Sequence, residues 1–353
     1  MREVIVEIEA WKQAGKPVAI ATNVKRDGLS LRPLGAKMAM TPQMEIAGSV
    51  TGGCIEGAVY QEGQTAIKSM QPKLLHYGVV GDQKPWDIGL SCGSSLDVFV
   101  ESLDSPAWKE VYPFVLECLQ KQYLASVATV ISGQFFGNKL MLWPDGRSVG
   151  SLGNSELDKK IQNFMQERML KQEADWTTLE INHEPVEVFV DVLVPEPRLI
   201  VVGASHIAIP LVSLAKVLGY HTIVIDPREA FATTARLPEV DELIIDWPST
   251  ALEKMHLDEM CYLAAISHDE KLDNPALAVA LRSSVRYVGV LGTRKNIEKR
   301  KNELRDLGVT EDQLKHLCAP IGVPLGAESP EEIALSILGE MVAARHQFKL
   351  NKE

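Results

Sequence analysis

The chain has 353 residues, a length at which about two domains are expected, each able to bury its own core. Its formal net charge of −11 argues against a nucleic-acid or membrane-surface partner, because phosphate-rich surfaces require a basic footprint. The first residues are charged and no stretch is apolar enough to span a bilayer, so we expect neither a signal peptide nor a membrane protein. The five cysteines are odd in number and widely spaced, which is typical of reduced thiols in a cytoplasmic protein.

One structural unit occurs twice in the first 195 residues. Each copy has three β-branched segments bounded by Gly and Pro, a helical stretch and a closing strand. In the first copy these are Pro17–Thr22, Gly35–Pro42, Ile46–Val50, Ile55–Ser69 and Leu96–Glu101; in the second they are Ser126–Ile131, Gly137–Pro144, Val149–Leu152, Leu157–Gln172 and Val186–Asp191. A chance likeness of amphipathic strands is the alternative. We predict a mixed α/β domain over 1–195 that is built from two related units, about 1–104 and 105–195.

The two copies differ at two loops. The first copy has Thr51–Gly57, with the sequence Thr-Gly-Gly-Cys-Ile-Glu-Gly, where the second has Gly153–Glu156. The first copy also has Gly89–Ser95, which contains Cys92, where the second has Asn182–Pro185. The scaffold repeats but these two loops do not, which indicates that the loops serve chemistry in the first copy.

The loop at Gly52 and Gly53 follows a strand and opens a helix. Amides at a helix N-terminus carry partial positive charge, so they can hold an anion and favour the thiolate form of Cys54. Cys92 and Gly93 lie in a second loop of small residues, and both cysteines can converge on one ligand. The alternative is a pair of structural cysteines in tight turns. Zinc is disfavoured, since no histidine partner stands at ligand spacing.

Polar side chains near these loops extend the candidate site. Ser49 and Thr51 are hydroxyl donors, although capping of the turn explains them equally well. Arg32, Lys37 and Lys25 are possible counterions for a phosphate, with a solvated surface role as the alternative. We therefore predict a cofactor site that includes Ser49, Thr51, Gly52, Gly53, Cys54, Glu56, Cys92, Gly93 and Arg32.

The pattern changes after Pro197, where short apolar strands alternate with helices. This alternation predicts a second domain over 196–348 with a parallel, doubly wound sheet. Gly203 follows the strand Arg198–Val202, and Asp226 ends the next strand 23 residues later. This is the context of a Rossmann dinucleotide fingerprint, with an acid placed for a ribose hydroxyl. Ser205 replaces the middle glycine and obstructs close approach to a pyrophosphate, which leaves NAD(P) binding open.

Further polar residues follow other strands of this predicted sheet. His206 follows the first strand, His268 and Asp269 follow Tyr262–Ile266, and Gly292 and Arg294 follow Tyr287–Leu291. Ligands bind at the carboxyl ends of strands in such sheets, and ordinary loop residues are the alternative. The second candidate site, for a nucleotide, comprises Gly203, Ser205, His206, Asp226, His268, Asp269, Gly292 and Arg294.

The motifs together resemble those of the XdhC/CoxI family of xanthine dehydrogenase accessory factors over nearly the whole chain. The matching segments are Gly48–Glu56, Gly89–Gly93, Gly203–Ala208, Asp226–Arg228, Ser267–Asp269, Tyr287–Arg294, Ala319–Gly322 and Ser329–Ile337. Two departures are Ser205, where the family commonly has glycine, and Ser94–Ser95, where a further small residue or glycine is expected.

The resemblance implies a molybdenum-cofactor chaperone and not a turnover enzyme. Such a protein binds molybdopterin, supports its sulfuration by a cysteine desulfurase, and inserts it into an apo-hydroxylase such as xanthine dehydrogenase. It implies that Cys54 and Cys92 contact the cofactor or the transferred sulfur, that the glycine amides receive the terminal phosphate, that molybdenum enters only through the pterin, and that the chain forms a homodimer. Two other hypotheses remain open: an NAD(P)-dependent oxidoreductase that uses Asp226, and a scaffold that docks the partner enzymes without holding cofactor.

Overall fold

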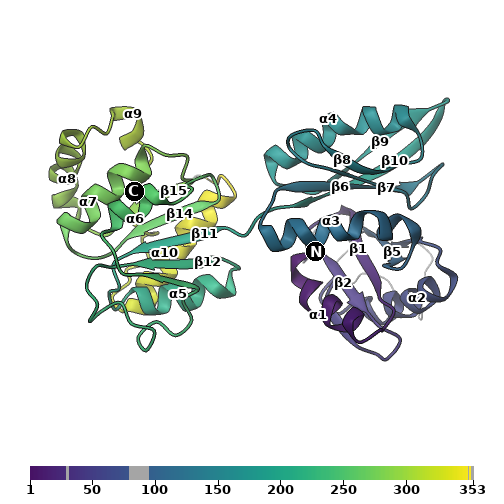
Figure 1. The fold of residues 1–353 in the computed structure, drawn as a ribbon, viewed down its shortest axis with the longest axis horizontal. Helices are drawn as coiled ribbons and strands as arrows, with labels where there is room; N and C mark the ends of the chain where they lie inside the picture. The colour runs from purple at the N-terminus through teal and green to yellow at the C-terminus, as the bar shows by residue number, and fades with distance from the viewer. Residues whose placement is uncertain (29–31, 79–94, 349, 351–353) are drawn as a thin grey trace. The chain divides into compact units, whose positions relative to one another are not determined.

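The computed structural model describes residues 1–28, 32–78, 95–348 and 350. The chain folds into two compact units, Met1–Pro195 and Glu196–Glu353 (Figure 1). Within the described residues, no helix combines the length and the apolar character that crossing a membrane requires.

The first unit contains two five-stranded sheets with the same strand order. Sheet A has the order β3-β2-β1-β5-β4, sheet B has the order β8-β7-β6-β10-β9, and every neighbouring pair is antiparallel. The strands of sheet A are β1 (Ala19–Asp27), β2 (Lys37–Met40), β3 (Ile46–Gly48), β4 (Lys73–Tyr77) and β5 (Ser95–Ser102). Those of sheet B are β6 (Ala125–Ser132), β7 (Lys139–Leu142), β8 (Ser148–Ser151), β9 (Asp175–Ile181) and β10 (Glu184–Leu193). The identical order confirms that the domain is built from two related units.

Each sheet packs one face against a helix of its own copy. The helices are α1 (Arg2–Gln13), α2 (Glu56–Ser69), α3 (Pro106–Lys121) and α4 (Ser155–Lys171). Val59 and Ala66 of α2 are buried on sheet A, and Ile161 and Met165 of α4 are buried on sheet B. Figure 1 shows α4 running across the outer face of its sheet. The other faces pack with α1 and α3 in a core that draws on both copies.

The predicted order of elements needs one correction in each copy. The prediction ran from the helix directly to the closing strand, whereas β4 and β9 intervene between them. Both are edge strands, and β9 alternates between exposed and half-buried residues along most of its length. Edge strands bury only part of one face, so their apolar signal is weaker than that of the central strands.

The second unit is a parallel six-stranded sheet, sheet C, in the order β13-β12-β11-β14-β15-β16. Its strands are β11 (Arg198–Val202), β12 (His221–Ile225), β13 (Glu242–Ile244), β14 (Cys261–Ala265), β15 (Tyr287–Val290) and β16 (Leu317–Cys318). The central strands are almost completely buried, as expected when helices cover both faces. The predicted doubly wound sheet is therefore confirmed.

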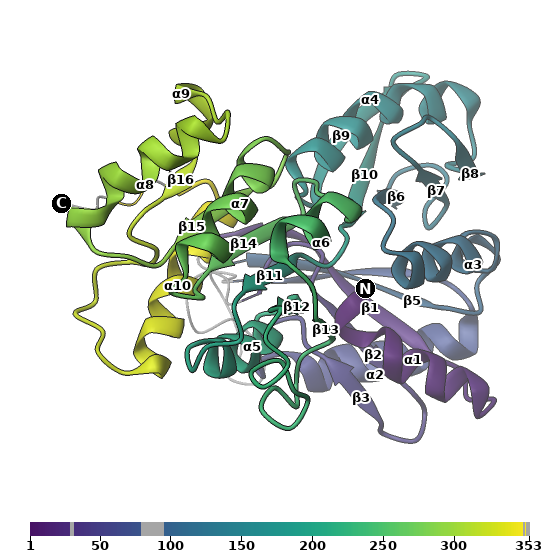
Figure 2. The same ribbon diagram turned by 60° about the vertical axis from the view of Figure 1, so that its left-hand side comes forward.

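The helices of the second unit cover the two faces of sheet C (Figure 2). On one face lie α5 (Ala208–Val217) and α10 (Pro330–Arg345), and on the other α6 (Pro248–Lys254), α7 (Glu270–Leu281) and α8 (Arg294–Asp306), followed by the short α9 (Glu311–Leu314). The chain reverses its direction of winding between β11 and β14. The loops after these two strands consequently lie side by side at the carboxyl ends, the position where ligands bind in this architecture.

Candidate functional site

The loop from Ser49 to Ile55 connects β3 to α2 and presents Cys54 to solvent. Gly52 and Gly53 adopt φ angles of 99° and 128°, which side chains other than glycine rarely tolerate. A Cβ atom on Gly53 would meet no atom within 4 Å, so the space beside the loop is open. The two glycines thus turn the chain outward and leave the thiol accessible on an uncrowded loop.

The carboxylate of Glu56, the first residue of α2, gathers the polar groups of this loop. It accepts hydrogen bonds from two hydroxyl groups and four backbone amides at 2.6–3.2 Å. The donors are Ser49 Oγ, Thr51 Oγ1 and the amides of Thr51, Gly52, Gly53 and Ile55. In this conformation an internal carboxylate thus takes the donors that the sequence analysis assigns to an anion, and the glycine amides are not vacant.

The electrostatics of this arrangement favour a charged Glu56. Partial burial alone would raise the pKa of the carboxyl group, because desolvation penalises the ionised form. Hydrogen bonds from Ser49, Thr51 and Gly52 outweigh that effect and lower the pKa of Glu56 to about 2. The loop thus stabilises negative charge at the position that Glu56 occupies.

The second copy closes the equivalent loop with fewer bonds. Asp158 stands seven residues after Ser151, as Glu56 stands seven residues after Ser49. The Asp158 carboxylate accepts only from the Ser151 hydroxyl and the Leu152 amide, both at 2.7 Å, among the described contacts. The carboxylate is thus a shared feature of the repeat, whereas the six-donor cradle belongs to the first copy.

The helix starts differ as well. Asn154 caps α4 through its side chain, which accepts from the next amides, whereas Ile55 gives α2 no side-chain cap. Aligned on Ser49 and Ser151, Cys54 corresponds to Glu156 of the second copy. The first copy thus lacks an ordinary N-cap at this helix start. It also carries a thiol where the second copy has Glu156.

The predicted basic residues take structural roles in this conformation. Arg32 donates to the backbone oxygen of Ser49 and pairs with Glu3, so it braces the start of the Cys54 loop. Lys25 pairs with Glu187 at 2.6 Å. Cys92 and Gly93 lie outside the described residues.

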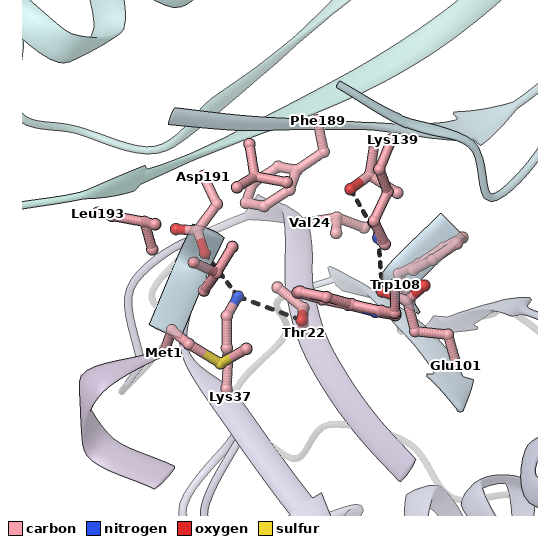
Figure 3. A pocket seen from close by; sticks show the side chains of 14 residues that line it. Met1, Thr22, Val24, Lys37, Glu101, Trp108, Lys139, Phe189, Asp191 and Leu193 are labelled. Carbon is pink, nitrogen blue, oxygen red and sulfur yellow. Dashed lines mark hydrogen bonds and ion pairs between the residues drawn. The ribbon is translucent and has the colours of Figure 1, made fainter. Parts of the chain in front are cut away.

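Two buried lysines, one from each copy and each facing the other copy, form a polar cluster between the sheets that was not predicted as a unit (Figure 3). Lys37 of β2 is 3% exposed and pairs with Asp191 of β10 at 2.8 Å. Lys139 of β7 is 2% exposed and pairs with Glu101 of β5 at 2.8 Å. The sequence signal for this cluster is a lysine at the same position of both copies, in Gly35-Ala-Lys and Gly137-Asn-Lys.

These residues line a cavity in which about 20 Å³ is open to the centres of water molecules. That space suits one or two buried waters and not a pterin-sized ligand. Thr22 and Thr129 complete the cluster by accepting hydrogen bonds from Lys37 and Lys139 respectively. We therefore assign the cavity to the pairing of the two copies and not to ligand binding.

The second candidate site lies at the carboxyl ends of neighbouring strands of sheet C. Gly203, with φ of 101°, packs so closely on the next loop that a Cβ would lie 2.4 Å from Ser267 Cα. Asp269 caps α7 through its side chain, and His206 and His268 are exposed. Gly292 is exposed ahead of α8, and Arg294 begins that helix. The structure thus joins the β11 and β14 loops directly.

Asp226 does not stand ready for a ribose hydroxyl as the sequence predicted. One carboxylate oxygen accepts from the backbone amide and Nε of Arg228, each at 2.9 Å. The other accepts from the Ala204 amide at 2.8 Å and from Arg228 Nη2 at 2.7 Å. Burial tends to raise the pKa of Asp226, but the bonds from Arg228 outweigh it and lower that pKa. The carboxylate is already saturated by its neighbours.

Within the described part of the chain, no group of three or more His, Cys, Asp or Glu side chains is arranged to hold a metal ion directly. The described residues fit a ligand that is anionic and that also binds a thiolate. The Ser49–Ile55 loop already holds a carboxylate and exposes a thiol beside it. A bound anion would have to replace Glu56 on those donors.

Known proteins resemble this chain in both units. The family model of the XdhC and CoxI family matches residues 11–78, and that of the XdhC Rossmann domain matches residues 199–341. A Bacillus subtilis protein described as a probable xanthine dehydrogenase subunit is 25% identical, with 96% of each chain covered. The Escherichia coli molybdenum cofactor insertion chaperone PaoD is 24% identical, with 95% of this chain and 86% of PaoD covered.

One solved structure shares the fold. The crystal structure of a protein described as a xanthine dehydrogenase from Bacillus halodurans superposes with a TM-score of 0.79 at 24% identity, covering 99% of this chain and 97% of that one. The matched models, one in each unit, and the full-length relatives agree with the motifs at Gly48–Glu56 and Gly203–Ala208. The chain belongs to the XdhC and CoxI family.

Proposed function

We propose that this chain is an accessory factor that binds the molybdopterin form of the molybdenum cofactor and delivers it to an apo-molybdenum hydroxylase such as xanthine dehydrogenase. In this proposal it also supports sulfuration of the cofactor by a cysteine desulfurase and acts as a homodimer. The observation that carries the proposal is the exposed Cys54 beside a six-donor anion cradle, in a loop whose equivalent in the second copy has neither the thiol nor the six donors. The names of the two relatives support the same role.

The cradle and the thiol divide the task of holding the cofactor. The hydroxyls of Ser49 and Thr51 and the amides of Gly52 and Gly53 would receive the terminal phosphate after Glu56 moves aside. Cys54, together with Cys92 in the proposal, would contact molybdenum or the sulfur in transfer, because a thiolate is both a soft ligand and a nucleophile. Glu56 keeps the loop closed until an anion replaces it.

The oxidoreductase alternative has less support. It requires Asp226 to accept a hydrogen bond from a ribose hydroxyl, and four N–H donors already occupy both oxygens of that carboxylate. The scaffold alternative predicts that the exposed thiol is dispensable, which the following experiment decides.

The test produces the chain together with an apo-xanthine dehydrogenase in a host that makes molybdopterin, then measures molybdenum and cyanide-releasable sulfur on the purified hydroxylase. Cys54→Ala is expected to lower both to the level without the chain, because the thiol is lost. Glu156→Ala alters the equivalent position of the second copy and is expected to leave both unchanged. Full activation by Cys54→Ala would contradict the role of the thiol and favour the scaffold.

A further inference from the structure

Two arginines and a phenylalanine form a cluster in the loop that follows β12. The guanidinium groups of Arg228 and Arg236 lie 4.6 and 5.2 Å from the centroid of the Phe231 ring. The ring is 43% exposed and the Arg228 side chain is 37% exposed, so both remain accessible at the surface. Arg236 also donates to the backbone oxygen of Ala204, which ties this cluster to the loop after β11.

The cluster occupies the position at which a Rossmann sheet holds the ribose edge of a nucleotide. An acid at the end of the second strand normally accepts from the ribose 2′-hydroxyl, and an arginine nearby accommodates a 2′-phosphate. Here Asp226 has no acceptor capacity left, because each oxygen already takes two N–H donors. A nucleotide with a plain ribose diol therefore finds no acceptor at this position.

One of the two arginines of this cluster, Arg236, carries a charge that no described ion pair neutralises. Asp226 neutralises one of the two guanidinium groups, and Glu229 is exposed and, among the described contacts, forms an ion pair with neither arginine. Arg236 donates through Nη1 to the backbone oxygens of Ala204 and Phe231, which carry no formal charge. Arg236 thus forms no ion pair with a carboxylate among the described contacts, whereas Arg228 is paired with Asp226 and also lies in the field of Asp269 and Asp273.

A second observation comes from the loop between β11 and α5. The hydroxyl oxygen of Ser205 is buried and forms no hydrogen bond with any described residue. A buried hydroxyl without a partner costs about 1–3 kcal/mol, so such groups usually serve a ligand or a water. Ser205 lies beside Ala204, whose amide and carbonyl contact Asp226 and Arg236. The unpaired hydroxyl and the arginine cluster are therefore neighbours.

We propose that the carboxyl-end edge of sheet C, at the loops after β11 and β12, binds a nicotinamide dinucleotide that carries a 2′-phosphate, in preference to the form with a free ribose diol. The phosphate lies against Arg228 and Arg236, and a water bonded to the Ser205 hydroxyl bridges to the pyrophosphate, whose close approach the Ser205 side chain prevents. A phosphate matches the planar guanidinium group through paired, charge-assisted hydrogen bonds. This ligand class goes beyond cofactor delivery by the first unit and does not depend on it.

The test measures the dissociation constants of NADPH and NADH for the full chain by isothermal titration calorimetry, with 2′,5′-ADP and 5′-AMP as fragments. NADPH is expected to bind at least about tenfold more tightly than NADH, which corresponds to about 1.4 kcal/mol. The fragments are expected to follow the same order. Equal affinities, tighter binding of NADH, or no binding of NADPH at millimolar concentration would overturn the proposal.

Arg228→Ala is expected to change the affinities for NADPH and NADH in opposite directions, which a general loss of folding would not do. The variant removes a phosphate contact and leaves each Asp226 oxygen with one backbone amide donor and room for a second, so the affinity for NADPH is expected to fall while that for NADH rises. Arg282→Ala, at the end of α7, removes an arginine of the same unit that bonds to the Leu307 carbonyl, and is expected to change neither. An Arg228→Ala protein that keeps its circular dichroism spectrum and an unchanged NADPH preference would contradict the assignment.

Discussion

Glu56 shows how one side chain can replace a ligand within its own loop. Most helices are capped by a short polar side chain at the residue before the first turn, as Asn154 caps α4. In α2 the cap is instead the carboxylate of Glu56, which reaches back to amides up to five residues earlier. Gly52 and Gly53 make this possible, because their positive φ angles turn both amides toward one point. The loop is thus preorganised for negative charge next to Cys54.

This arrangement predicts an unusually acidic Glu56. Its carboxyl group is expected to titrate near pH 2, against an ordinary value of 4.5, when followed by 13C NMR and assigned through Glu56→Gln. Because the pKa in the folded chain is depressed, the contribution of Glu56 to loop stability is complete above about pH 4.5 and is lost as the pH falls toward 2. A midpoint near 4.5 would mean that the cradle does not form in solution.

The two sheets of the first unit are joined by reciprocal ion pairs. Lys37 on β2 reaches Asp191 on β10, while Lys139 on β7 reaches Glu101 on β5, so each copy supplies a lysine to the other copy's closing strand. The aromatic ring of Trp108 lies 4.6 Å from the Lys139 ammonium group. Such pairs add little net stability, but they penalise any other pairing of the copies.

Replacing one partner of an ion pair is therefore expected to lower the free energy of unfolding more than replacing both partners. Lys139→Met leaves the Glu101 carboxylate buried without its partner and should lower the free energy of unfolding of the first unit by about 3–5 kcal/mol. The double variant Lys139→Met with Glu101→Leu should recover most of that loss. Urea denaturation followed by fluorescence measures both. A double variant as unstable as the single one would show that the pair itself contributes most of the energy.

At the scale of the whole molecule, the two units have separate hydrophobic cores. Within the described residues, each hydrophobic cluster takes all its members from one unit. The chain passes from one unit to the other at Pro195 and Glu196. The first unit carries the candidate thiol and the second carries the candidate nucleotide site, so ligand binding to the two units can be tested independently.

Separate cores predict separate unfolding. Calorimetry of the full chain is expected to show two transitions, and Lys139→Met should lower the midpoint of one by roughly 6–20 °C while leaving the other unchanged. A single transition that shifts as a whole in this variant would contradict independent stability of the units.

The sequence was sufficient for features that repeat or that are strongly periodic. The duplicated strands and the parallel sheet were predicted because central strands such as β6 and β11 are rich in buried apolar and β-branched residues. The edge strands β4 and β9 were missed because half of their surface is exposed. The internal contacts of Glu56 and Asp226 were also missed. Both depend on which side chain reaches a loop amide in three dimensions, which spacing along the chain does not determine.

The most direct test of the central claim is the pterin content of the purified chain. The wild type and Cys54→Ala would be isolated from a host that makes molybdopterin, and bound pterin and molybdenum would be measured against Glu156→Ala as the control. The account predicts near-stoichiometric pterin in the wild type and in Glu156→Ala, and its loss in Cys54→Ala. A wild-type chain that carries no pterin would contradict the proposed role in cofactor delivery.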